Sequence, residues 1–152
     1  MNAKKVILVL NNIRSRFNVG AIFRTADAAG VEKIYLCGIT PVPPHPKIDK
    51  VSLGAEKNIP FEKKHSTSRV IDALKKEGFQ IIALEQYKKS ANYTEFLNTN
   101  TIALVVGNEV KGISPNILKK CHQVICIPMK GKKESLNVSV ALGISLFEII
   151  YH

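Results

Sequence analysis

Residues 102–115 read IALVVGNEVKGISP, and this stretch indicates the class of the fold. Its five apolar residues, 102–106, are typical of a buried strand, and the loop that follows contains Gly107 and Gly112. Ser114 and Pro115 then lead into a short helix. A strand that runs through a polar loop into a helix is the building unit of an α/β domain.

The same alternation continues on both sides of this stretch. Short apolar runs occupy residues 6–10, 34–37, 79–84 and 124–127, and the segments between the runs repeat their apolar residues with a period near 3.6. Strands that alternate with helices predict a mostly parallel sheet flanked by helices. With 152 residues and no internal repeat or linker, the chain is expected to form a single domain, residues 1–152.

Local signals predict where several helices begin and end. Asn18 is suited to cap a helix that Gly30 closes, and Ser66 or Thr67 is suited to cap a helix that Gly78 closes. A proline-rich stretch between these two helices is incompatible with regular helix or a central strand, and we expect it to be an exposed connection. Its prolines are Pro41, Pro43, Pro44 and Pro46.

The last segment, residues 137–151, has Glu148 as its single charged residue. Read as a helix, it is apolar on all sides, and such a helix requires burial on more than one side. In a small domain this pattern favours a subunit interface. A central core helix is the alternative.

Composition favours a polyanionic partner. The chain has 22 Lys and Arg against 12 Asp and Glu, a net charge of +10, which favours nucleic acid, although solvated surface charge alone would also explain it. Three cysteines without paired spacing indicate reduced thiols and a cytoplasmic location, and no second ligand pair supports a metal site. No signal peptide or membrane-spanning stretch is expected.

The first candidate motif is NVGAIFRTADAAG, residues 18–30. Arg24 lies among Ala, Ile and Phe residues of a helix that is otherwise suited to packing, so its guanidinium is expected to point at an anionic group. An ion pair with Asp27 or Glu32 is the structural alternative.

The second and third motifs are loops that follow strands. Gly107 and Gly112 have the spacing of a phosphate-binding loop, but Ile113 and Ser114 replace the Lys and Ser or Thr of such loops, which disfavours ATP or GTP. The third motif, residues 127–141, reads IPMKGKKESLNVSVA. There a basic loop follows a strand, and Ser135 or Asn137 is expected to cap the final helix.

Together, in this order, the three motifs resemble the SpoU (TrmH-like) family of RNA 2′-O-methyltransferases, over nearly the whole chain. The resemblance implies a SPOUT fold with a deep C-terminal trefoil knot, an exception to the rule that chains avoid knots. It also implies S-adenosylmethionine as cofactor and a homodimer whose active site forms at the interface. We expect no N-terminal RNA-binding extension of the kind that larger members have, and we therefore expect the basic surface of this domain to capture the substrate.

The resemblance also assigns site residues by position. Arg24 would be the key catalytic residue, organised together with the substrate by Asn18, Glu109, Ser135 and Asn137. The cofactor site would be lined by Leu84, Gly107, Ile127, Met129, Ser135, Leu136 and Asn137.

The expected reaction is methyl transfer from S-adenosylmethionine to a ribose 2′-hydroxyl of tRNA or rRNA. A guanidinium stays protonated at any pH below about 12 and therefore cannot accept a proton near neutral pH. Arg24 is expected instead to position the target phosphate and to stabilise the negative charge that develops on the ribose oxygen. Two alternatives are an RNA-binding protein of the same fold without methyl transfer and a dinucleotide-dependent oxidoreductase. The absence of a G-x-G-x-x-G turn after the first strand disfavours the oxidoreductase.

Overall fold

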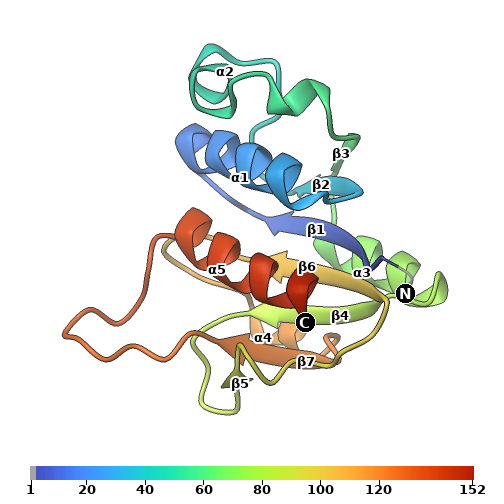
Figure 1. Ribbon diagram of the computed structural model, residues 1–152, viewed down its shortest axis with the longest axis vertical. Helices are drawn as coiled ribbons and strands as arrows, with labels where there is room; N and C mark the ends of the chain where they lie inside the picture. The colour runs from blue at the N-terminus through green and yellow to red at the C-terminus, as the bar shows by residue number, and fades with distance from the viewer. Residues whose placement is uncertain (1–2) are drawn as a thin grey trace.

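The computed structural model describes residues 3–152, which form one parallel sheet with helices on both faces (Figure 1). The strands are β1 (Lys5–Asn11), β2 (Lys33–Cys37), β3 (Phe61–Lys64), β4 (Gln80–Leu84), β5 (Ala91–Asn92), β6 (Thr101–Val106) and β7 (Gln123–Cys126). The helices are α1 (Arg16–Ala29), α2 (Pro46–Ser52), α3 (Thr67–Lys76), α4 (Pro115–Leu118) and α5 (Val138–Tyr151), with a 3₁₀ helix η1 (Ala55–Lys57). The predicted parallel α/β architecture is confirmed; the trefoil knot stays a prediction.

The order of the strands shows where a ligand site belongs. The sheet runs β3-β2-β1-β6-β4-β7-β5, and every pair of neighbours is parallel. The chain first builds outward from β1 through β2 to β3 and later continues on the other side of β1. In open parallel sheets, ligands bind beyond the carboxyl ends of the strands, next to the point where the strand order reverses. Here that point lies between β1 and β6, and the cavity described below lies next to it, at the ends of β6, β4 and β7.

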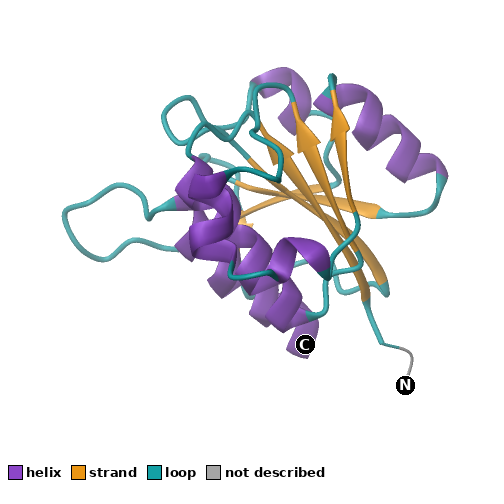
Figure 2. Ribbon diagram, turned by 90° about the horizontal axis from the view of Figure 1, so that it is seen from above, coloured by secondary structure: helices purple, strands orange, loops and turns teal. Residues whose placement is uncertain are grey.

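The sheet separates two hydrophobic cores, because successive side chains of a strand point to opposite faces. From β1, Leu8 and Leu10 pack with α1, α2 and α5, whereas Ile7 and Val9 pack with α3. Figure 2 shows helices on both sides of the twisted sheet. The central strands β1 and β6 are buried on both faces, which explains why they read as continuous apolar runs.

All five predicted strands are present, and their ends agree with the predictions to within one residue. Two edge strands were not predicted. In β3, the half-exposed Phe61 and Glu62 precede two exposed lysines, so the segment has no apolar run, and β5 has only two residues. Edge strands are often short and charged, and such strands carry little periodic signal.

The prediction that Asn18 caps the first helix is wrong. The cap is Ser15, whose hydroxyl accepts a hydrogen bond from the Asn18 N–H at 3.1 Å. Asn18 lies inside the first turn and is buried, and its side chain forms hydrogen bonds with Glu109 and Asn137 instead. Gly30 ends α1 in the left-handed conformation, as predicted, and Ser66 is the cap of α3.

The proline-rich connection is less exposed than predicted. Pro44 is exposed, but Pro43 and Thr40 are buried. Pro46 is the first residue of α2, where its missing N–H leaves no helix hydrogen bond unmade.

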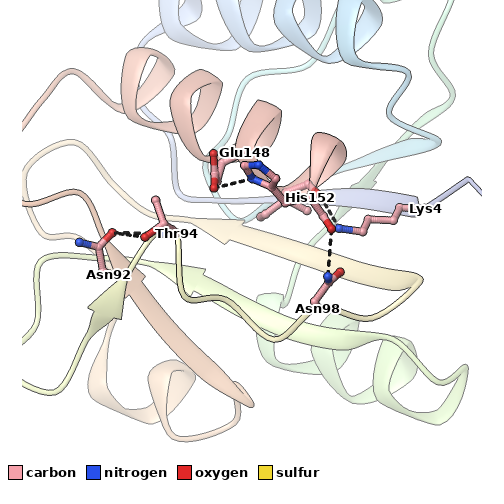
Figure 3. Close-up of polar contacts among 7 residues, drawn as sticks. Lys4, Asn92, Thr94, Asn98, Glu148 and His152 are labelled. Carbon is pink, nitrogen blue, oxygen red and sulfur yellow. Dashed lines mark hydrogen bonds and ion pairs between the residues drawn. The ribbon is translucent and has the colours of Figure 1, made fainter.

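Helix α5 is fixed at its carboxyl end and exposed along one side. Near that end, the Lys4 ammonium donates to the carbonyl of Ile149 at 2.6 Å, and the Asn98 amide donates to the carbonyl of His152 at 2.9 Å (Figure 3). One side of the helix packs into the core. The opposite side leaves apolar residues open to solvent, so the alternative of a central core helix is wrong. These exposed residues are Val140, Ile144, Phe147 and Tyr151.

Candidate active site

A cavity of about 310 Å³ lies at the carboxyl edge of the sheet, and we call it the site cavity. The loops after β4, β6 and β7 and the first turn of α5 line it. Its walls are partly apolar, and three carboxylates also face it. The apolar lining comes from Leu84, Val106, Ile127, Leu136 and Ala141, and the carboxylates are Glu85, Glu109 and Glu134.

The loop after β6 is closed tightly on itself. The Gly112 N–H donates to the carbonyl of Asn108 at 2.9 Å, and a Cβ at Gly107 would lie 2.6 Å from the Gly112 carbonyl carbon. No larger residue than glycine fits at position 107 without displacing the backbone of the loop. The Asn108 side chain accepts from the N–H groups of Val110 and Lys111, both at 2.9 Å. The loop thus forms a rigid wall of the site cavity.

Glu109 connects this loop to the start of α1. Its carboxylate accepts hydrogen bonds from the backbone N–H groups of Arg14 and Ser15 and from the Asn18 side chain, each at 2.9 Å. Asn18 accepts in turn from the Asn137 amide at 3.2 Å. Three residues that are far apart in the sequence therefore meet in one hydrogen-bonded chain.

Asn137 brings the start of α5 next to Asn18 and Glu109. Its side-chain oxygen accepts from the N–H groups of Ser139 at 2.9 Å and Val140 at 3.4 Å, so it is the cap of the helix. Ser135 and Leu136 precede the cap and face the cavity. The positive end of the α5 dipole is therefore directed toward the site.

The hydrogen bonds to Glu109 keep it ionised. Partial burial opposes the charge, but the N–H groups of Arg14 and Ser15 and the amide of Asn18 stabilise it, and the net effect lowers the pKa of Glu109 below its usual value of 4.5. At neutral pH this residue is therefore a fixed anion and an acceptor, not a proton donor.

This shift predicts a pH-dependent contribution to stability. Because the pKa of Glu109 is lower in the folded state, its stabilising effect is complete above pH 4.5 and is lost as the pH falls through the folded-state value. We expect Glu109→Gln to be less stable than the wild type at pH 7, with a difference that shrinks below pH 4.5. Urea denaturation of both proteins at a series of pH values measures this. A difference that stays constant with pH would contradict it.

Most of the residues assigned from the sequence lie together. The site cavity is lined by Leu84, Gly107, Glu109, Ile127, Ser135, Leu136 and Asn137, and Asn18 is hydrogen-bonded to two of these. Met129 is half-buried and lies outside the lining. The roles of all these residues stay predictions.

Arg24 is not part of the cavity of its own chain. It is exposed on α1, and within residues 3–152 it forms no ion pair with Asp27 or Glu32, so that alternative is wrong. Its neighbour Thr25 faces α5, since a Cβ at Gly143 would lie 3.5 Å from the Thr25 methyl group. Arg24 is thus exposed on α1, next in sequence to a residue that faces α5.

Sequence reasoning missed several lining residues. Glu85 and Gln86 follow β4 directly, and Cys126 ends β7. The signal that locates them is positional, because residues at the carboxyl ends of adjacent parallel strands meet at one edge. Within residues 3–152, no cluster of His, Cys, Asp and Glu is arranged to hold a metal ion, and no helix is long and apolar enough to cross a membrane.

Comparison with known proteins agrees with this geometry. Residues 5–147 match the model of the SpoU rRNA Methylase family. The chain belongs to this family. The prediction made from the three motifs is thereby confirmed, and the oxidoreductase alternative is wrong.

Individual SpoU proteins resemble the chain over nearly all its length. It is 39% identical over 146 residues to the tRNA (guanosine(18)-2′-O)-methyltransferase of Aquifex aeolicus (strain VF5), covering 95% of this chain and 68% of that protein. It is 36% identical to the 23S rRNA (guanosine-2′-O-)-methyltransferase RlmB of Coxiella burnetii (strain RSA 493 / Nine Mile phase I), covering 95% of this chain and 57% of that protein.

A solved structure shows the same fold. The AdoMet-bound rRNA methyltransferase from Sinorhizobium meliloti superimposes with a TM-score of 0.91 at 30% identity. The match covers 97% of this chain and 56% of that one. The chain thus spans little more than half the length of several SpoU relatives.

Proposed function

We propose that this protein transfers a methyl group from S-adenosylmethionine to a ribose 2′-hydroxyl of tRNA or rRNA. The observation that carries the proposal is the convergence of Asn18, Glu109 and Asn137 at one cavity. Both relatives named above are RNA 2′-O-methyltransferases, one acting on tRNA and one on rRNA. Reduced cysteines and an RNA substrate are consistent with work in the cytoplasm.

The cavity fits this cofactor chemically. Its volume of about 310 Å³ lies within the usual range for ligand sites, roughly 300–1,000 Å³. Leu84, Ile127 and Leu136 offer apolar surface to an adenine ring, and the carboxylates suit the positive charges of the sulfonium and amino groups. When bound, S-adenosylmethionine supplies an electrophilic methyl group.

The chain's own residues organise the acceptor. Glu109 holds the backbone before α1 and the side chain of Asn18, which in turn meets Asn137. These hydrogen bonds hold the three polar side chains in fixed positions, where they can orient a ribose hydroxyl. Arg24 would hold the adjacent phosphate and stabilise developing alkoxide charge, and a phosphate oxygen of the RNA would accept the hydroxyl proton.

A homodimer would complete this site. The exposed side of α5 has Val140 and Ile144 one turn apart, and Phe147 stacks on Tyr151 at a centroid distance of 6.0 Å. A contiguous exposed apolar surface of this kind marks an interaction site. Pairing of two copies through α1 and α5 would bury it and would bring Arg24 of one protomer toward the site cavity of its partner.

The RNA would bind along the carboxyl edge of the sheet. Exposed cations follow four of the strands there, and within residues 3–152 none of them takes part in an ion pair. Elsewhere, Lys33 and Lys64 pair with Glu62, and Lys120 pairs with Asp72. Unpaired cations around the cavity are available for phosphates. They are Arg14, Arg16, Lys88, Lys89, Lys111, Lys130, Lys132 and Lys133.

Removing part of this basic edge should weaken RNA binding in a salt-dependent way. The triple variant Lys130→Ala, Lys132→Ala, Lys133→Ala should bind a tRNA transcript at least about tenfold more weakly at low salt, because it loses contacts with phosphates. Each lost contact should also make the dependence of log K on log salt concentration shallower by about one. Fluorescence anisotropy at several salt concentrations measures both quantities. A control with the same charge loss elsewhere, Lys57→Ala, Lys75→Ala, Lys76→Ala, should change them much less. Equal losses in both variants would contradict this location.

The test of the proposed function is methyl transfer itself. The protein is incubated with methyl-labelled S-adenosylmethionine and unmodified total RNA, and the labelled nucleotide is then mapped. Label on a ribose 2′-oxygen of tRNA or rRNA supports the proposal. RNA binding without label would favour the alternative, an RNA-binding protein of the same fold that transfers no methyl group.

A further inference from the structure

Glu85 and Gln86 connect three of the loops that surround the site cavity. The Glu85 carboxylate accepts from the N–H of Ile113 at 2.8 Å, in the loop after β6, and from the N–H of Gln86 at 3.0 Å. The Gln86 amide donates to the carbonyl of Ile127 at 2.8 Å, directly after β7. We call this set of contacts the loop clasp.

Gly112 permits the closest contact of the clasp. It has a positive φ of 66°, and a methyl group at its Cα would collide with the Glu85 carboxylate. The carboxylate therefore rests directly on the backbone of the loop that forms one wall of the cavity. A carboxylate suits this position, because its two oxygens accept one N–H group each, from Ile113 and from Gln86, whereas a neutral amide side chain offers a single acceptor oxygen.

We propose that Glu85 is a positioning residue for S-adenosylmethionine: through the loop clasp it holds the loop after β6 against the loop after β7, and so sets the shape of the cavity. This inference rests on the proposed function. It assigns to Glu85 and Gln86 a role in cofactor affinity and none in the transfer of the methyl group.

The first test is cofactor binding by calorimetry. Glu85→Ala leaves the Ile113 N–H without its charged acceptor, which should weaken S-adenosylmethionine binding by roughly tenfold to a hundredfold. Glu85→Gln keeps one acceptor oxygen and should lie between Glu85→Ala and the wild type. Gln86→Ala, which loses a neutral hydrogen bond, should cost less than about tenfold. RNA affinity should not change in these variants.

Kinetics separate positioning from general damage. The KM for S-adenosylmethionine should rise in Glu85→Ala, while kcat at saturating cofactor stays within about threefold of the wild-type value. A fall in kcat with unchanged KM would overturn the proposal. An equal loss of affinity in Glu85→Gln and Glu85→Ala would also overturn it, because Glu85→Gln removes the charge but keeps an acceptor oxygen for the Ile113 N–H, and the loss would then come from charge alone.

A double-mutant cycle tests the contact itself. Gly112→Ala should weaken cofactor binding both by backbone strain and by collision with Glu85. In a Glu85→Ala background the collision is absent, so the same change should cost less. If the losses of binding free energy caused by Glu85→Ala and Gly112→Ala are simply additive in the double variant, the contact between these two residues does not act on cofactor binding and the proposal is overturned. If the wild type itself binds no S-adenosylmethionine, the proposed function fails; if it binds and Glu85→Ala binds equally well, only the present inference fails.

Discussion

Replacing Arg24 by lysine is expected to lower the rate of methyl transfer at least about a hundredfold. The reason is the loss of the planar, two-pronged donor, since lysine keeps the charge but offers a single point contact. Removing one preorganised donor from a developing oxyanion typically costs about 10² to 10³ in kcat. Single-turnover transfer to RNA at saturating S-adenosylmethionine measures the effect.

An effect of Arg24→Lys on activity can be separated from an effect on stability. Arg24 is exposed and makes no ion pair within residues 3–152, so the substitution should change the free energy of unfolding by less than about 0.5 kcal/mol. Arg69→Lys, at an exposed position of α3, is the matched control and should transfer methyl groups at the wild-type rate. Full transfer by Arg24→Lys would contradict the role given to the guanidinium.

Negative charges introduced on the exposed side of α5 are expected to separate the protomers and to lower the rate of methyl transfer. Ile144 is 40% exposed and Phe147 is 36% exposed in the single chain. Ile144→Asp with Phe147→Asp would place two carboxylates in the proposed interface, where desolvation of an unpaired charge is strongly unfavourable. Light scattering should show the wild type at twice the chain mass of 16.8 kDa and the double variant as a monomer.

A surface substitution of the same kind elsewhere controls for this result. Leu53, the residue that follows α2, is 66% exposed, so Leu53→Asp should leave the dimer and the activity intact. The monomeric α5 variant should lose at least about a hundredfold in transfer rate, because Arg24 and the site cavity would then no longer meet across the interface. A monomer that methylates RNA at the wild-type rate would contradict the shared site.

The sequence by itself determined the fold class and the family. Strands buried on both faces, such as β1 and β6, are apolar along most of their length, so they are visible as runs without any structural information. The three motifs that identified the family are likewise continuous in sequence, since the first is one helix and the other two are each a strand end with its following loop. Asn137 was expected at the start of the last helix for the same local reason.

Only the tertiary structure decided how these pieces meet. The part played by Asn18 depends on Glu109, 91 residues away, and local reasoning therefore mistook it for a helix cap. The clasp made by Glu85 depends on Ile113, 28 residues away, and on a glycine whose missing side chain leaves room for the carboxylate. Contacts between carboxyl ends of parallel strands are set by strand order, and strand order is a property of the folded sheet that no single segment encodes.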